Sequence, residues 1–349
     1  MFPYKIEKLE ENLDKKLMTV FTGERNGFCQ VGPKKWVLPL AYKDHAEKYY
    51  NFQPKCDDIW VVTYPRSGTT WCQELVWLLN NNLDYEKAMS IPMEKRFPFF
   101  EFSILHSVQF HEDVIALNNN RADVIEKLAF WRQPGYEWLI DEPSPRHIKT
   151  HLPISLLSPN LLNTSKVVYV ARNPKDVAVS YYHHNKLLKL HGYIGEFEEY
   201  WDYFEKDLLV YSPYWEHIKE GWEVRNHKNV LFLFYEDLIK DLPSNIKKVA
   251  SFLNKPINDE QLDKLVKHLH IDNFRASLKV HGQIEMEGIV NKSGQGFIRK
   301  GVIGGNTEFT PDLIERADKW IADNLAKTDL TFPVIPKTLG PASIVPPDI

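Results

Sequence analysis

The segment from Thr63 to Trp71, TYPRSGTTW, brings together residue types that could hold an anion: an arginine, a glycine, a serine and two threonines. The apolar run just before it, residues 59–63, predicts a short buried strand, and the apolar residues after Thr69 recur with helical spacing. A loop in that position presents the amides and the positive dipole end of a helix to a bound anion. A tight strand–helix turn with no ligand is an equally good interpretation of the loop alone.

Two familiar loops of this kind do not match. The nucleoside triphosphate loop GxxxxGKS/T is absent, because no glycine lies five residues before Gly68 and Thr69 stands in place of the lysine. The serine-hydrolase elbow GxSxG also fails, since Pro65 occupies its first glycine position. A kinase-like phosphoryl transferase is therefore disfavoured.

Other short apolar runs indicate what positions this loop. Residues 147–151, 165–172 and 229–235 predict further strands, and the second of these is followed by a helix with Asp176 as its expected cap. Alternating strands and helices predict an α/β fold with a central parallel sheet flanked by helices. Ligands of such folds bind beyond the carboxyl ends of the strands.

Composition sets the class of protein. At 349 residues, with 43% hydrophobic and 26% charged residues, the chain is typical of a globular protein and not of a disordered one. Roughly 150 residues per domain would allow two domains, but no boundary is evident. We expect a single domain over residues 1–349, with a wrapping segment at 1–40 and a proline-rich tail at 331–349.

The net charge of the chain bears on its binding partners, and its cysteine content bears on its cellular compartment. The net charge of −4 gives no reason to expect nucleic acid as a partner. Three cysteines without a CxxC spacing indicate a reduced compartment. Neither a signal peptide nor an apolar run of about 20 residues is evident. We therefore expect a cytoplasmic protein without a membrane segment.

Five motifs occur in a fixed order, and together they resemble the cytosolic sulfotransferase family, with insect members closest in appearance. They are TYPRSGTTW (63–71), KTHLP (149–153), ARNPKDVAVSYYH (171–183), FYED (234–237) and RKG (299–301). The resemblance covers roughly residues 40 to 325. It implies transfer of a sulfuryl group from 3′-phosphoadenosine 5′-phosphosulfate to a hydroxyl or amino acceptor, leaving the 3′,5′-bisphosphate, with a phosphosulfate-binding loop that resembles a P-loop and with no metal.

The resemblance also implies roles for individual residues. The loop residues that would hold the 5′-phosphosulfate are Arg66, Ser67, Gly68, Thr69 and Thr70, and Trp71 and Tyr235 would contact the adenine. The residues that would bind the 3′-phosphate are Arg172, Ser180, Arg299, Lys300 and Gly301. His151 would be the catalytic base, assisted by Arg66 and by Lys149.

The chemistry requires these residue types independently of the family. A neutral histidine can accept the proton of an attacking hydroxyl. Residues two apart in a strand share a face, so Lys149 and His151 can point into one pocket. Charge that builds on the leaving phosphate must be met by preorganised donors such as Arg66.

The acceptor is expected to be a small apolar alcohol or phenol, such as a xenobiotic phenol, a steroid or a retinoid-like alcohol, which would suit a role in detoxification. The aromatic stretch at 98–102 supplies Phe99, Phe100 and Phe102 for its pocket, and we expect His183 to join them while His184 is solvated. A catalytically weak protein that binds a lipophilic ligand in the same pocket is the alternative. If the acceptor is an allylic alcohol, its sulfate ester can eliminate sulfate, and the net product is then a dehydrated alcohol.

Four departures from the family pattern stand in the chain. The segment from His268 to Ile271 differs from the serine and phenylalanine usually found near the adenine. Arg66 replaces the usual lysine, and arginine spreads its charge over a planar fork. The GDWK stretch expected after RKG is replaced at residues 304–307. The dimer motif KxxxTVxxxE becomes Asn306, Thr310, Pro311 and Glu315, which leaves the oligomeric state open.

Overall fold

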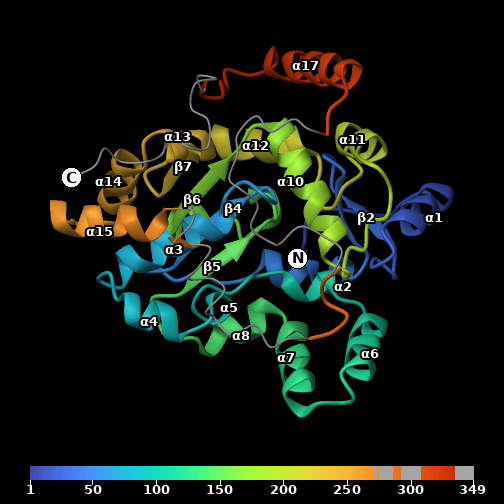
Figure 1. Ribbon diagram of the computed structural model, residues 1–349, viewed down its shortest axis with the longest axis horizontal. Coiled ribbons are helices and arrows are strands. Elements are labelled where there is room, and N and C mark those ends of the chain that lie inside the picture. Colours follow the sequence, from blue (N-terminus) through green and yellow to red (C-terminus); the bar gives the residue numbers. More distant parts are fainter. Residues whose placement is uncertain (271–272, 275–285, 292–307, 335–349) are drawn as a thin grey trace.

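The computed structural model describes residues 1–270, 273–274, 286–291 and 308–334. Within these residues, the centre of the fold is a four-stranded parallel sheet with the strand order β5-β4-β6-β7 (Figure 1). The strands are β4 (Ile59–Thr63), β5 (His147–Thr150), β6 (Lys166–Ala171) and β7 (Val230–Phe234). The predicted α/β fold with a parallel sheet is therefore confirmed.

Helices cover both faces of this sheet because its strands are apolar on both sides. Ile59 and Val61 of β4 pack in one cluster with α3 (Thr69–Asn80), α14 (Leu242–Leu253) and α15 (Asp259–Leu269). Trp60 and Val62 face the opposite way and pack with α10 (Pro174–Leu187) and α12 (Tyr214–Glu223). The alternation of side chains along a strand thus divides one apolar run between two helical layers.

Helix α10 begins earlier than the sequence suggested. Asn173 is its N-cap and accepts a hydrogen bond from the Lys175 amide at 3.0 Å, and Pro174 occupies the first helical position. The expectation that Asp176 caps this helix is therefore wrong. Asp176 lies in the first turn, where its carboxylate interacts favourably with the positive end of the helix dipole.

The N-terminal region contains more regular structure than its sequence indicated. In its described residues, β1 (Ile6–Lys8), β2 (Phe28–Val31) and β3 (Trp36–Pro39) form an antiparallel sheet. Helices α1 (Glu11–Val20) and α2 (Tyr42–Tyr50) accompany it. Val37 of β3 exchanges 2.8 Å backbone hydrogen bonds with Tyr211 and Ser212, so this segment is packed onto the main domain.

Residues 85–141, between α3 and β5, form a set of short helices. They are α4 (Tyr85–Ser90), α5 (Met93–Arg96), η1 (Phe102–Leu105), α6 (Val108–Leu117), α7 (Ala122–Arg132) and α8 (Gly135–Asp141). Helices α6 and α7 project from one end of the molecule (Figure 1). The remaining elements are η2 (Ile154–Leu156), α9 (Leu161–Thr164), α11 (Phe197–Glu205), α13 (Tyr235–Lys240) and α17 (Pro311–Leu325).

A buried ion pair joins the start of β4 to the start of β5. Arg146 donates two hydrogen bonds, of 2.7 and 2.6 Å, to the Asp58 carboxylate and a third, of 2.7 Å, to the Leu139 carbonyl. Asp58 and Arg146 are 0% and 2% exposed. Because this contact brings β5 beside β4, it also sets the position of the segment that follows β5.

We expect Arg146→Ala to lower the free energy of unfolding by about 3–5 kcal/mol, because it leaves a buried carboxylate without its partner. Urea denaturation followed by tryptophan fluorescence measures this. Arg121→Ala is the control, since the Arg121–Asp123 pair is about half exposed and solvent screens it, so the loss of stability should be much smaller. Equal losses of unfolding free energy in the two variants would show that the Asp58–Arg146 pair is no more important than an exposed one.

Candidate active site

The loop between β4 and α3 has a backbone shape that requires glycine at one position. Gly68 is the N-cap of α3, with φ at 93°. A Cβ atom at this position would lie 2.5 Å from Cδ2 of Tyr235, so a larger residue would be strained and would also clash. The loop consequently packs close to Tyr235, and the first-turn amides of α3, which include those of Thr69 and Thr70, lie directly after it.

Two buried polar atoms beside this loop lack partners. In the described part of the chain, neither Oγ of Ser67 nor Nε of Arg172 has a hydrogen-bond partner, although these residues are only 0% and 8% exposed. Buried polar groups are normally paired. A hydroxyl and a guanidinium left in this state next to a helix N-terminus fit an anionic ligand such as a phosphate.

Arg172 is held in place by the groups around it. Its Nη1 donates to the Arg66 carbonyl at 3.0 Å, and its guanidinium lies 4.3 Å from the centre of the Tyr235 ring. The hydroxyl of Tyr214 donates to the Arg172 carbonyl. Such contacts fix the direction of the guanidinium before any ligand binds.

Arg66 reaches from the loop to helix α10. Its Nε donates to Oγ of Ser180 at 3.1 Å, and its Nη1 lies 3.5 Å from Nδ1 of His184. This differs from our expectation for the two adjacent histidines: His184 is the one beside the loop, whereas His183 pairs with Glu308. Burial and the nearby Arg66 hold the pKa of His184 well below its usual range.

The two aromatic residues assigned to the adenine also meet at the loop. The Trp71 and Tyr235 rings are 6.0 Å apart and inclined at 71°. Trp71 Nε1 donates to the Leu269 carbonyl at 2.9 Å, which anchors the indole. The roles of both residues in nucleotide binding remain predictions.

His151 lies just beyond β5 and is 7% exposed. Its Nδ1 is 2.8 Å from the Thr63 carbonyl oxygen and 3.1 Å from Oγ1 of Thr63, which in turn lies 2.7 Å from Oγ1 of Thr69. Because a carbonyl oxygen only accepts, Nδ1 carries the proton and Nε2 of the neutral ring is the basic nitrogen. Burial and the neighbouring Lys149 hold the pKa of His151 well below its usual value.

Lys149 completes a group of basic side chains. Burial, opposed by the nearby Glu101 and assisted by Arg66, lowers its pKa to about 8. Its Nζ lies 4.1 Å from the centre of the Phe99 ring. Arg66, Lys149 and His151 therefore meet at the carboxyl ends of β4 and β5, as the motif spacing predicted.

A buried carboxylate that the sequence analysis missed supports this group from behind. Oε1 of Glu101 accepts a 2.7 Å hydrogen bond from the His151 amide, and Oε2 accepts one of 2.7 Å from the Thr150 hydroxyl. Burial raises the pKa of Glu101 to about 7. Nε2 of His217 donates to the His151 carbonyl at 2.9 Å from the other side.

The aromatic stretch before η1 divides between the site and the core. The Phe99 ring is 5.0 Å from His151, so Phe99 lies beside the basic group, and Phe102 packs behind it with the two rings 5.4 Å apart. Phe100 packs on Phe52 and Trp60 in the core and is 0% exposed. The part that these residues and His183 take in acceptor binding remains a prediction.

Some predicted features lie outside the described residues. Arg299, Lys300 and Gly301 are among them, as are residues 304–307. Thr310 caps α17 and Pro311 is its first residue. Among the described residues, no group of three or more His, Cys, Asp or Glu side chains is placed to hold a metal ion, and no helix is long and apolar enough to span a membrane.

Comparisons with known proteins identify the family. Residues 56–329 match the model of the sulfotransferase domain. Luciferin sulfotransferase of Photinus pyralis is 34% identical over 86% of this chain and 80% of its own length. Sulfotransferase 1C2 of Oryctolagus cuniculus is 32% identical over 84% of this chain and 92% of its own length. The chain therefore belongs to the sulfotransferase family, as its motifs predicted.

Solved structures show the same relationship. The crystal structure of a retinol dehydratase in complex with retinol and PAP has a TM-score of 0.86 and 36% identity, covering 95% of this chain and 99% of that one. A second structure of a retinol dehydratase, with androsterone and inactive cofactor PAP, gives the same values.

We expect Glu101→Gln to lower kcat roughly 10- to 100-fold, because an amide cannot accept both hydrogen bonds and His151 shifts. The ionised carboxylate is the form that accepts both, so wild-type kcat should fall as pH drops through about 7, and this limb should disappear in the variant. Steady-state kinetics across pH measures both effects.

Glu126→Gln on the exposed face of α7 is the control and should leave the profile unchanged. If Glu101 had a purely structural role, Glu101→Gln would instead lower the activity by the same factor at every pH and lower the melting temperature.

Proposed function

We propose that the protein transfers the sulfuryl group of 3′-phosphoadenosine 5′-phosphosulfate to the hydroxyl of a small apolar alcohol or phenol. The observation that carries this proposal is the setting of His151, a buried neutral histidine whose Nδ1 is committed to the Thr63 carbonyl. The proton-accepting nitrogen is thus Nε2, in a group that also contains Arg66 and Lys149. This is the arrangement of a general base beside a site for developing negative charge.

In this proposal each residue has a chemical task. Nε2 of His151 takes the proton from the acceptor hydroxyl as its oxygen bonds to sulfur. The bond from sulfur to the bridging phosphate oxygen breaks, and the electron pair stays on that oxygen. Arg66, Lys149 and the first-turn amides of α3 stabilise the charge that forms there.

Donor recognition would use the polar atoms without partners. Ser67 and the α3 amides suit the 5′-phosphosulfate, and Arg172 with Ser180 suits the 3′-phosphate. Trp71 and Tyr235 would enclose the adenine, and Arg299 to Gly301 would complete the 3′-phosphate site. Support for this donor comes from relatives whose structures contain PAP.

A second candidate reaction is sulfation followed by elimination. The observation that favours it is the 36% identity to a retinol dehydratase of known structure. The C–O bond of an allylic sulfate would break, sulfate would leave with the electron pair, and a carbon-bound proton would be lost to a base. Mass spectrometry of products from retinol distinguishes the reactions, since elimination gives a product lighter than the alcohol by one water.

We expect His151→Ala to reduce sulfuryl transfer by a factor of at least about 100, because general-base catalysis typically contributes that much. Its affinity for the bisphosphate should stay within about twofold of wild type, since His151 lies on the acceptor side. Radiolabelled sulfate transfer and calorimetry measure the two quantities. Full activity would refute the base assignment, while acceptor binding without any sulfated product in the wild type would favour the ligand-binding alternative.

A further inference from the structure

The backbone of Arg66 has a conformation that is unusual for a residue with a long side chain. Its φ angle is 69°, in the left-handed region, which costs free energy and occurs most often where function requires it. The Arg66 carbonyl oxygen accepts the 3.0 Å hydrogen bond from Nη1 of Arg172, which holds the backbone. The Arg66 guanidinium extends from this anchor to α10, so the side chains of α10 decide its orientation.

Helix α10 presents two acceptors to the Arg66 guanidinium. Nε of Arg66 donates to Oγ of Ser180 at 3.1 Å, and Nη1 lies 3.5 Å from Nδ1 of His184, one turn further along the helix. A planar fork held at two of its nitrogens keeps one plane, whereas a fork held at one nitrogen can rotate. The two contacts together therefore set the direction in which the guanidinium faces.

The contact with Arg66 decides which nitrogen of His184 carries the proton. A guanidinium stays charged and only donates, so Nδ1 of His184 accepts and the neutral ring has its proton on Nε2. This is the opposite tautomer from that of His151. Burial and then the charge of Arg66 hold the pKa of His184 well below its usual range. A lone pair directed at a cation is a poor base and does not bind an anion, but it is suited to orienting the cation.

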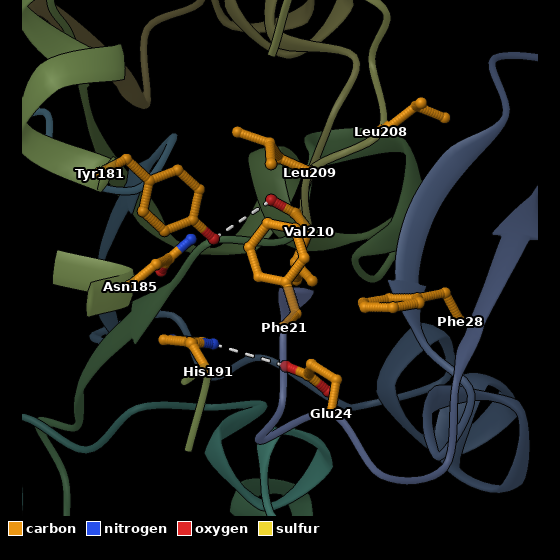
Figure 2. Close-up of a pocket in the computed structure, with 9 residues that line it drawn as sticks. All are labelled: Phe21, Glu24, Phe28, Tyr181, Asn185, His191, Leu208, Leu209 and Val210. Carbon is orange, nitrogen blue, oxygen red and sulfur yellow. Dashed lines mark hydrogen bonds and ion pairs between the residues drawn. The ribbon is translucent and has the colours of Figure 1, made fainter. Parts of the chain in front are cut away.

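The surroundings of α10 hold the His184 ring in place. The adjacent Asn185 donates from Nδ2 to the Tyr200 hydroxyl at 2.9 Å, which fixes the rotation of the helix. The His191 ring lies 5.6 Å from the His184 ring, and Nδ1 of His191 is 3.4 Å from Oε1 of Glu24 (Figure 2). Asn185, His191 and Glu24 are all buried. The ring therefore faces the loop before any ligand binds.

We propose that His184 is a positioning residue for Arg66, and that its Nδ1 holds the guanidinium in the plane in which it meets the charge on the leaving phosphate. The inference rests on the proposed function, since it presumes that Arg66 stabilises this charge. Ser180 supplies the second anchor without losing its own task, because a hydroxyl that accepts from Arg66 can still donate to a phosphate. The contribution of Arg66 thus depends on His184.

A double-mutant cycle between Arg66 and His184 tests this dependence. His184→Phe keeps a ring but lacks an acceptor, and we expect it to lower kcat for sulfuryl transfer roughly 10- to 100-fold because the guanidinium is misdirected. In the Arg66→Lys background the same change should lower kcat less than about twofold, since an ammonium group has no plane to orient. Equal fold losses in the two backgrounds would overturn the proposal.

A second substitution distinguishes an acceptor from a ring that merely fills space. The amide oxygen of asparagine can take the place of Nδ1, so His184→Asn should keep kcat within about threefold of the wild type. A merely structural role would give the reverse order, with His184→Phe more active than His184→Asn, because phenylalanine matches the volume of the imidazole better. His184→Leu replaces His184→Phe if thermal unfolding shows that the latter has not folded.

The matched control is Tyr182→Phe, also on α10. It removes a buried hydroxyl that accepts a 3.1 Å hydrogen bond from Lys186. It should leave kcat within about twofold in both the wild-type and the Arg66→Lys backgrounds. A loss from Tyr182→Phe as large as that from His184→Phe would assign the effect to the helix as a whole and refute the role of His184.

Affinity for the 3′,5′-bisphosphate separates this proposal from the proposed function. We expect calorimetry to show that His184→Phe weakens binding roughly three- to tenfold in the wild-type background and not in the Arg66→Lys background. Sulfated product from the wild type, with no coupling in kcat or in affinity, would uphold the proposed function and refute the positioning role. Coupling in affinity, with no sulfated product from any alcohol or phenol, would uphold the positioning role and refute the proposed function.

Discussion

The hydrogen bond from His151 to the Thr63 carbonyl is the contact on which the site depends. It links the ends of β5 and β4 and, by occupying Nδ1, decides which nitrogen of the imidazole is basic. The Glu101 carboxylate and the His217 imidazole hold the His151 backbone from two sides. Because the parallel register of β4 and β5 sets the distance between Thr63 and His151, the sheet itself is part of the chemistry. The buried Arg146–Asp58 pair at the opposite ends of these strands keeps that register.

Burial gives these residues their properties. In water, a lysine and an arginine are fully protonated and hydrated, and a histidine is partly protonated. Inside this site, burial holds His151 in its neutral form, while the pKa of Lys149 falls only to about 8 and Arg66 stays charged. The site therefore combines a neutral base with a permanent cation, which is what proton removal beside a developing phosphate charge requires. The Arg66 guanidinium uses its planar shape to contact both Ser180 and His184.

The sequence predicted those parts of the structure that local patterns determine. Runs of apolar residues located all four parallel strands within a residue or so, and the motifs placed Arg66, Lys149 and His151 at one edge of the sheet. The N-terminal strands escaped notice because segments such as Ile6–Lys8 are too short to show a period. Glu101, His217 and Asn185 were missed for another reason: their partners lie 50, 66 and 15 residues away, and no spacing rule connects them. His184, expected to be solvated, instead lies beside Arg66, a contact that only the packing of α10 on the loop reveals. The roles of the site residues, the oligomeric state and the cytoplasmic location remain predictions.

We propose that Ser67, Arg172 and the α3 amides form a preorganised site for a nucleotide that carries a 3′-phosphate. Titration calorimetry of the wild-type protein with 3′-phosphoadenosine 5′-phosphate and with ADP tests it most directly, because the two ligands share the adenine and the total of two phosphates but not their placement. We expect the 3′,5′-bisphosphate to bind at least about tenfold more tightly than ADP, the effect of a charged hydrogen bond. Equal affinity for the two nucleotides would contradict it.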